Sequence, residues 1–324
     1  MTHMRTLPRL LFAVLLLALS FTSPAQTYPS RPIRVILGFP PGGGGEILVR
    51  TIGQKLTERW GQPIVVENRP GAGSNIAAAE LVKSAPDGYT LMYMPAALVV
   101  NPYLYAKVPY DLAKDFTPVT LLASFPLVLV VHPSVAAKSV AELIALAKAK
   151  PGALNFASIG NASPPHLAGE TFRMQAGVNI VHVPYKGSAP AQTALLAGEV
   201  QLMFDTAVSA VPNIKSGRTR ALAVTTAARS PLFPDLPTMA ESGLREFDLD
   251  GWAGLVGPAG MPAEIAQRLQ QEIAPILRAP EMAERLASLG ADARGTTPDE
   301  FRRFIAAESA KWRRIVEASG AKID

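Results

Sequence analysis

The chain has 324 residues, of which 48% are hydrophobic, and it contains no cysteine. Without cysteine, disulfides, zinc–thiolate sites and a cysteine nucleophile are excluded. The formal net charge is +5, but the basic residues are scattered apart from short clusters such as Arg302-Arg303 and Lys311 to Arg314. A nucleic-acid footprint requires a contiguous basic stripe with interleaved aromatics, so we expect no nucleic-acid partner.

Residues 1–25 have the pattern of a secretory signal peptide. Arg5 and Arg9 precede the apolar run from Leu10 to Phe21, and Ser23-Pro24-Ala25 supplies small residues before the cleavage site. The run is too short for a comfortable membrane span, and no later segment approaches one. We therefore expect export to the periplasm and a soluble mature protein of about 300 residues, enough for two domains. A retained N-terminal anchor is the alternative.

The first half of the mature chain alternates between strand and helix patterns. Ile33 to Phe39 is a continuous apolar run, which is typical of a strand buried on both faces. Strands that alternate with helices predict an α/β fold with a mostly parallel sheet and helices on both faces. The expected strands are 33–39, 64–67 and 89–94, and the expected helices are 46–60 and 75–83.

A long β-rich stretch, Thr117 to Val131, is interrupted only by Pro126. A single strand of that length is unusual. The pattern therefore predicts two strands that meet at Phe125-Pro126 and cross between two domains.

The alternation restarts after this stretch. Ser139 with Glu142, and Thr297 with Glu300, have the spacing of capping boxes that open helices. The expected strands are 154–158, 178–183, 200–204 and 221–225, and helices are expected after 139, from 166, up to 196, over 262–277 and over 301–318.

Four glycines, Gly42 to Gly45, lie between the first strand and the helix that begins at Glu46. Glycines in such a loop let backbone N–H groups face a ligand, and a helix N-terminus favours an anion. No Gly-Lys-Ser/Thr follows, so the loop is not a P-loop. The pattern favours binding of an anionic group. A tight turn without a ligand is the alternative, with Glu46 as a partner of the helix dipole.

The loop from Gly160 to His166 also joins a strand to a helix, and Ser163 suits its N-cap. Ser163 and His166 permit a hydrolase interpretation, but the Gly-x-Ser-x-Gly elbow is absent from this loop. His132 and His182 lie beside strands, and no metal-ligand spacing connects the histidines. We expect no catalytic residue, metal or cofactor.

Tyr185 to Ser188 and Asp205 are expected where parallel strands end, which is where ligands collect in open α/β sheets. Asp205 either accepts a hydrogen bond from a ligand amine or braces the N–H groups of its own loop. The sequence does not choose between these roles.

Seven short motifs follow one another along the mature chain. They are 28–33 (YPSRPI), 39–44 (FPPGGG), 66–73 (VENRPGAG), 101–105 (NPYLY), 164–170 (PPHLAGE), 183–187 (VPYKG) and 233–238 (FPDLPT). With these motifs the chain resembles the Bug-type receptors of tripartite tricarboxylate transporters. Seven collinear motifs are far more specific than any single loop.

The resemblance implies a type II periplasmic-binding-protein fold, in which two α/β domains joined by crossover strands close on a ligand in the cleft between them. The first domain would comprise 26–124 and 250–324, and the second 125–249. Family ligands are mostly small carboxylic acids and amino acids, held by backbone N–H groups and waters and passed to the membrane subunits of a transporter. By position, the ligand-binding residues are Pro41, Gly42, Gly43, Gly44, Ala97, Ser158, Gly160, Asn161, Ser163, Lys186, Gly187 and Asp205.

Two positions depart from the family pattern. Glu46 stands where relatives commonly have Asp, and Ala96 to Val100 stands where they often carry a polar Thr-His or Ser-His pair. If the segment 96–100 faces the ligand, it offers methyl groups in place of hydroxyl donors. We therefore hypothesise a ligand with one carboxylate at the Gly-rich end and an apolar body, such as an aromatic or longer aliphatic acid. The alternative is that these side chains only pack against the sheet.

We expect the receptor to be a monomer that delivers its ligand to a transporter. One alternative keeps the fold and changes the output, so that the loaded receptor engages a sensor kinase. A second alternative is an exported hydrolase, which would lose turnover when Ser163 is replaced by Ala.

Overall fold

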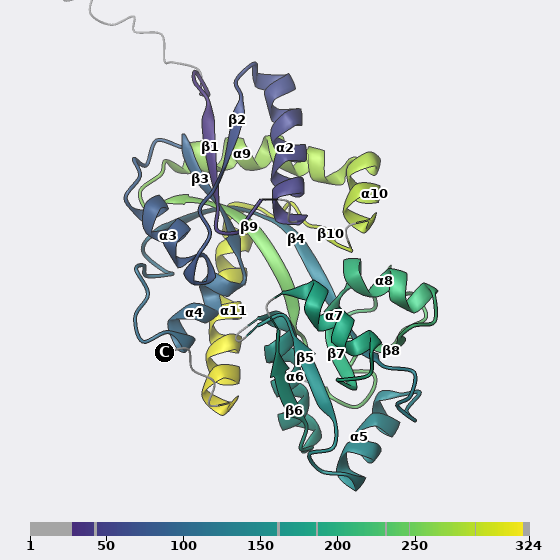
Figure 1. The fold of residues 1–324 in the computed structure, drawn as a ribbon. Coiled ribbons are helices and arrows are strands. Elements are labelled where there is room, and N and C mark those ends of the chain that lie inside the picture. The colour runs from purple at the N-terminus through teal and green to yellow at the C-terminus, as the bar shows by residue number, and fades with distance from the viewer. Residues whose placement is uncertain are drawn as a thin grey trace, which may run out of the picture.

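The computed structural model describes residues 28–41, 44–160, 163–185, 187–230, 232–245, 247–288 and 290–319, so the expected signal peptide lies outside the described residues. The chain forms two α/β lobes (Figure 1). They are joined by two long antiparallel strands, β4 (Phe116–Val131) and β9 (Asp250–Pro258). This is the two-domain α/β architecture that the sequence predicts.

The first lobe contains the N-terminal strands and the C-terminal helices. Its remaining strands are β1 (Ile33–Leu37), β2 (Ile64–Asn68), β3 (Thr90–Pro95) and β10 (Asp292–Ala293). Its helices are α2 (Gly44–Trp60), α3 (Asn75–Val82), α4 (Ala97–Leu104), α9 (Ala263–Arg278), α10 (Pro280–Ser288) and α11 (Pro298–Ser319), with the short 3-10 helix η2 (Ala72–Ser74) before α3.

The second lobe is built from the middle of the chain. Its strands are β5 (Asn155–Ser158), β6 (Val181–Pro184), β7 (Leu202–Thr206) and β8 (Arg220–Val224), and its helices are α5 (Val140–Ala149), α6 (Pro164–Ala176), α7 (Ser188–Leu196) and α8 (Ala207–Lys215). The capping box predicted at α5 is present, because Ser139 Oγ accepts from Glu142 N at 3.2 Å. At α11, Thr297 Oγ1 likewise accepts from Glu300 N at 3.3 Å.

The strands follow the order β2-β1-β3-β9-β4-β7-β5-β6, with β8 and β10 also pairing with β4. Pairs within a lobe, such as β1 with β3 and β5 with β7, are parallel. Every pair that involves β4 or β9 is antiparallel. The sheet is therefore mixed and not mostly parallel as expected, because the joining strands run against their neighbours.

The stretch 116–131 is one continuous strand, so the prediction of two strands is wrong. Its partner changes where the break was expected: residues up to Pro126 pair with β9, and residues from Leu127 pair with β7. Pro126 lacks an N–H group, and it lies at the last residue pair of the β4–β9 ladder. A proline at that point disturbs little of either ladder.

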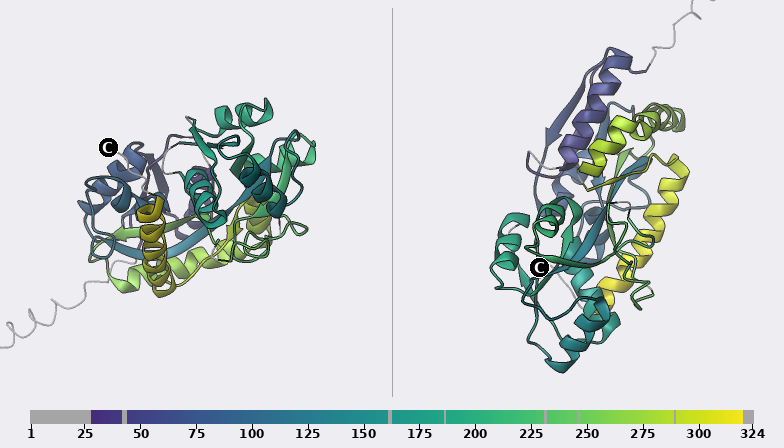
Figure 2. Two further views of the ribbon diagram at one scale, coloured as in Figure 1. Left: turned by 90° about the horizontal axis from the view of Figure 1, so that it is seen from below. Right: turned by 90° about the vertical axis from the view of Figure 1, so that its right-hand side faces the viewer.

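Helices cover both faces of the first-lobe sheet. Val35, Leu37 and Leu91 pack in the cluster that includes α2 and α9, whereas Ile36 and Met92 pack with α3, α4 and α11. This alternation follows from the two-residue period of a strand. Helix α11 runs along the side of the molecule past both lobes and contacts α4 and α6 (Figure 2).

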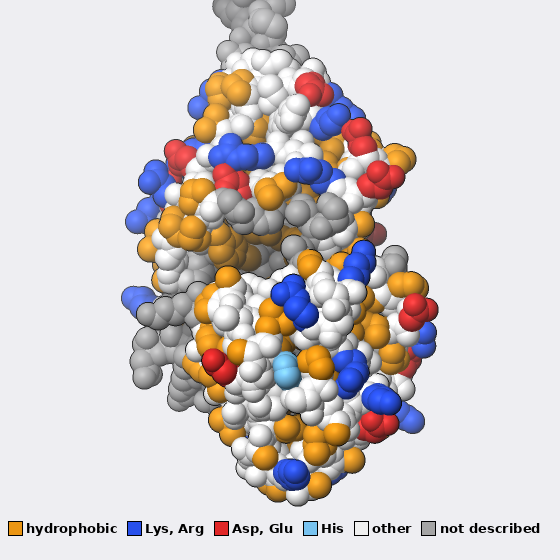
Figure 3. Space-filling view, turned by 45° about the vertical axis from the view of Figure 1, so that its right-hand side comes forward, with side chains coloured by type: hydrophobic (Ala, Val, Ile, Leu, Met, Phe, Trp, Pro, Cys, Tyr) orange, Lys and Arg blue, Asp and Glu red, His pale blue; other side chains and the backbone are white. Residues whose placement is uncertain are grey.

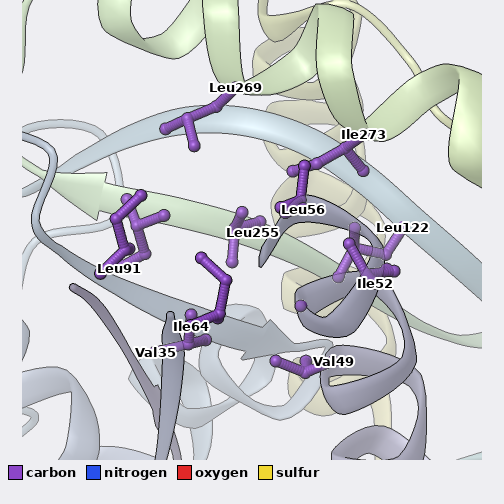
Figure 4. A pocket seen from close by; sticks show the side chains of 12 residues that line it. Val35, Val49, Ile52, Leu56, Ile64, Leu91, Leu122, Leu255, Leu269 and Ile273 are labelled. Carbon is purple, nitrogen blue, oxygen red and sulfur yellow. The ribbon is translucent and has the colours of Figure 1, made fainter. Parts of the chain in front are cut away.

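A small void lies in the first-lobe core between the sheet, α2 and α9 (Figure 4). It measures about 20 Å³ and only apolar side chains and one glycine line it, among them Val35, Val49, Leu255 and Ile273. A dry apolar space of this size has room for about one water and no polar partner for it. The void is a packing feature and not a ligand site.

No helix among the described residues is long and apolar enough to cross a membrane.

Candidate functional site

A cleft separates the two lobes (Figure 3). It holds a cavity of about 390 Å³ whose walls come from both lobes and from the joining strands β4 and β9. The lining residues are Phe39, Gly73, Tyr93, Pro95, Ala96, Ala97, Asn101 and Tyr105 of the first lobe, Phe125, Leu127, Gly251 and Trp252 of the joining strands, and Ile159, Ser163, Pro164, Pro165 and Thr206 of the second lobe.

The cleft wall is mainly apolar. Most of its lining side chains are aromatic, aliphatic or proline, and no lysine or arginine is among the described residues that line it. Concave, largely apolar cavities of this size with a few placed polar groups are typical of small-molecule sites. The chain therefore has room between its lobes for a small ligand with an apolar body.

The segment 96–100 divides between the cleft and the core. Ala96 and Ala97 line the cleft at the start of α4. Leu98, Val99 and Val100 are 0%, 0% and 3% exposed and pack in the core. The apolar wall proposed from sequence thus consists of two alanines, and the alternative, packing against the protein interior, holds for the other three residues.

The glycine-rich turn leads from β1 into α2. Pro41 is exposed in this turn, and Gly44 begins the helix; Gly42 and Gly43 lie outside the described residues. Glu46 is 8% exposed, and its Oε1 accepts from Arg50 Nε at 2.7 Å and from Nη2 at 2.6 Å. Its charge is therefore compensated along the helix by Arg50.

The loop after β5 is held by its own polar groups. Ser158 is fully buried; its Oγ donates to the Gly160 carbonyl at 3.0 Å and accepts from Gly160 N at 3.2 Å. Ser163 Oγ donates to the same carbonyl at 2.7 Å. Gly160 has φ 137°, a conformation that side-chain-bearing residues rarely adopt. Asn161 lies outside the described residues.

Two histidines, the buried His166 and the half-buried His182, lie behind this loop. His182 Nε2 contacts Ser158 Oγ at 2.7 Å, and its ring stacks on His166 with centroids 3.9 Å apart. Burial, with the neighbouring His166, lowers the pKa of His182 to about 4. Both rings are therefore neutral at pH 7, and His182 supports the loop through its contact with Ser158.

Asp205 is the last residue but one of β7 and is 2% exposed. Its carboxylate accepts from Thr206 N at 2.8 Å, from Gln192 Nε2 at 2.9 Å and from Ser209 Oγ. Burial raises its pKa. Of the two roles that the sequence left open, the contacts correspond to bracing: Asp205 fixes Thr206, which lines the cleft.

Gly187 caps the start of α7 with φ 108°, and its N–H donates to the carbonyl of Ile159 at 3.2 Å. It therefore ties the β6–α7 turn to the loop that lines the cleft. Lys186 lies outside the described residues. The ligand roles carried over by position for these residues stay predictions.

The strand β9 supplies the floor of the cleft. Trp252 lines the cavity, and its indole N–H donates to Glu308 Oε2 at 2.8 Å. Two residues earlier, Asp250 has a buried Oδ1 with no hydrogen-bond partner among the described residues. Burial and the adjacent Asp248 raise the pKa of Asp250 to about 7. The joining strands thus carry a titratable group near the cleft.

Sequence reasoning did not place the aromatic lining residues in the site. Phe39, Tyr93, Phe125 and Trp252 each lie in an apolar strand pattern or beside one, where core packing is the ordinary expectation. One signal was available: Tyr93 and Phe39 lie near the ends of β3 and β1, where each strand leads towards a loop. No group of three or more His, Asp or Glu side chains among the described residues is placed to hold a metal ion.

Comparison with known proteins gives concordant relatives. The sequence profile described as "Tripartite tricarboxylate transporter family receptor" matches residues 48–321. Protein BugT of Bordetella pertussis (strain Tohama I) is 40% identical over 301 residues, covering 92% of this chain and 92% of that protein.

Two solved structures resemble the fold closely. The structure of R. palustris Rpa4515 with adipate has a TM-score of 0.80 and 36% identity, covering 91% of this chain and all of the other. The structure of MatC from Rhodopseudomonas palustris with bound malate has a TM-score of 0.75 and 31% identity, covering 89% and all of the other. Both are similar to this chain over both lobes.

Proposed function

Because this chain belongs to the family of tripartite tricarboxylate transporter receptors, a family of solute-binding receptors and not of enzymes, we propose that it captures a small carboxylate with an apolar body and delivers it to membrane subunits. The hydrolase alternative is set aside on the same ground. Membership of the family makes the chain a solute receptor. The identity of its ligand and the delivery to membrane subunits are what we propose.

One observation carries the proposal: the 390 Å³ cavity has walls from both lobes and from the strands that join them. A ligand held there contacts two bodies at once, so binding favours their approach. The loops at its edges belong to helix starts, where backbone N–H groups favour an anion without a dedicated cation.

The wall composition supports an apolar ligand body. Pro95, Ala97, Phe125 and Trp252 offer carbon surface and no side-chain hydroxyl. A hydroxyl-rich acid placed against such a wall would lose hydrogen bonds to water without replacing them, at about 1–3 kcal/mol for each group. An aliphatic or aromatic acid loses nothing there. Rpa4515, which binds adipate, and MatC, which binds malate, support the carboxylate end of the ligand.

Export and domain closure are parts of the same proposal. Residues 1–25 would direct the chain to the periplasm, and the leader pattern around Arg5 and Leu10 supports this. The domains would be 26–124 with 250–324, and 125–249, moving about β4 and β9. The exchange of β4 partners at Pro126 supports a boundary at that point. Closure about the ligand is then recognised by the membrane subunits.

A thermal-shift panel tests the ligand class. Adipate, hexanoate, benzoate, phenylacetate, malate and free amino acids would each be added to the purified protein. A ligand at one hundred times its Kd stabilises the folded state by about 2.7 kcal/mol. We expect adipate or the apolar monocarboxylates to raise Tm by several degrees more than malate. Stabilisation by malate or amino acids alone would refute the apolar body, and stabilisation by none of the acids would refute the carboxylate.

A further inference from the structure

The hydroxyl of Tyr93 belongs to a largely buried side chain at the cleft wall and has no hydrogen-bond partner among the described residues. The side chain is 5% exposed and lines the cleft from the second half of β3. Among the described residues, no side chain or backbone group makes a hydrogen bond with its Oη. A phenol hydroxyl that no protein group occupies at a cavity wall is available to a bound ligand.

The phenol lies against the start of α2. A Cβ added to Gly45 would come within 2.7 Å of Tyr93 Cζ and 2.8 Å of Oη. Gly45 is the second residue of a helix of 17 residues, whose first-turn N–H groups have no partner within the helix. Tyr93 therefore connects the cleft wall to a helix N-terminus, and only glycine at 45 leaves room for its ring.

The surroundings keep the phenol protonated and in place. Burial raises the pKa of Tyr93, so the hydroxyl remains a donor throughout the physiological range. The ring makes an edge contact with Phe39, with centroids 6.4 Å apart and planes at 77°. The one acidic side chain in the first turn of α2, Glu46, is held by Arg50. An anion near Tyr93 would therefore meet a donor, the partial positive charge of the helix and a neutralised acid.

We propose that the Tyr93 hydroxyl donates a hydrogen bond to the ligand carboxylate at the N-terminus of α2, and that Gly45 is required to admit it. This inference rests on the proposed function and adds a side-chain contact to a site otherwise described by backbone donors. It also orients the ligand: the carboxylate lies at the α2 end, and the body extends along Pro95 and Ala97 towards Trp252.

The test compares acids with their neutral amides. Calorimetry would measure binding of adipate, hexanoate, benzoate and phenylacetate, and of hexanamide and benzamide, to wild type and to Tyr93→Phe. A hydrogen bond to a charged group is worth more than one to a neutral group. We expect Tyr93→Phe to weaken the acids about tenfold or more and to weaken the amides much less.

Two further variants make the outcome decisive. Tyr103→Phe removes a hydroxyl that bonds Ser309 Oγ at 2.6 Å, away from the cleft, and should bind the acids as wild type does. Gly45→Ala keeps an allowed helical residue but pushes on the Tyr93 ring, and should weaken the acids as Tyr93→Phe does. If wild type binds an acid and both Tyr93→Phe and Gly45→Ala bind it within about twofold, the inference is wrong and the proposed function stands. If wild type binds no acid, both fall.

Discussion

Asp205 allows the bracing role and the ligand-binding role to be separated by one substitution. Asp205→Asn keeps the size of the side chain but replaces one acceptor oxygen by an NH₂ group. In the wild type the carboxylate accepts from Thr206 N, Gln192 Nε2 and Ser209 Oγ. With the oxygen kept at Oδ1, the new NH₂ group faces Gln192 Nε2, so Gln192 must turn its amide over or lose this hydrogen bond.

The expected cost follows from that count. A buried donor without a partner costs about 1–3 kcal/mol. Part of this is offset because the substitution removes a buried charge, whose unfavourable burial shows in the raised pKa of Asp205. We expect a net loss of about 1–2 kcal/mol, which lowers Tm by roughly 2–8 °C for a protein of this size.

The assay combines urea unfolding with calorimetry at a temperature well below Tm. The bracing role predicts lower stability with ligand affinity changed by no more than about threefold, which is under 1 kcal/mol. The matched variant Ser209→Ala removes one donor of the same cluster, so the two substitutions should be non-additive by at least about 0.5 kcal/mol. Unchanged stability together with lost binding would refute the bracing role and make Asp205 a ligand contact.

Three further predictions concern Ala97, Leu98 and the histidine pair. Ala97→Thr adds a hydroxyl to the cleft and should shift the ligand preference towards polar acids; calorimetry checks this, and an unchanged preference between hexanoate and malate would contradict it. Leu98→His places an imidazole in the core and should lower the free energy of unfolding by about 2–4 kcal/mol, which urea unfolding measures. The pKa of His182 is lowered from 6.5 to about 4, so the unfolded chain takes up a proton that the folded chain rejects, and stability should fall as pH drops from about 6.5 to 4. Solvent reaches the half-buried ring, so His182 should contribute about 1–2 kcal/mol to the difference in stability between pH 7.5 and pH 4.5. In His182→Gln the difference in Tm between these two pH values should be smaller by that contribution. An identical pH dependence in both proteins would show that His182 does not titrate this way.

Strand and helix positions followed from local patterns where the signal was strong. The runs that became β1, β2 and β3 were visible because apolar strand residues and Gly-rich turns alternate, and both capping boxes formed as their spacing predicted. Helix α4 was missed because Leu98, Val99 and Val100 are three consecutive apolar residues, two of them β-branched, next to Asn101-Pro102. Such a run favours a strand locally, and packing in the core overrides that preference.

Helices α8 and α10 were missed for related reasons. Both are short, and a proline stands inside α8 and at the start of α10. Proline normally marks a helix boundary, so short segments that contain it give a weak helical signal. The continuity of β4 was missed because Pro126 locally predicts a strand end. The proline is tolerated where β4 changes from pairing with β9 to pairing with β7, and this pairing depends on residues that are distant in the chain.

For the site, the sequence by itself determined which loops have the chemistry to hold an anion: the turn before α2 and the loop before α6 follow strands, carry glycine or serine and open helices. Motif order along the chain was enough to indicate the family. Only the tertiary structure decided which side chains meet. Tyr93 and Trp252 belong to strands far apart in the sequence, and whether such residues enter the core or the cleft depends on how β3, β9 and the lobes are arranged. The physical reason is that a local pattern encodes burial and period, whereas a cavity wall is the sum of contacts between segments that are distant in the chain.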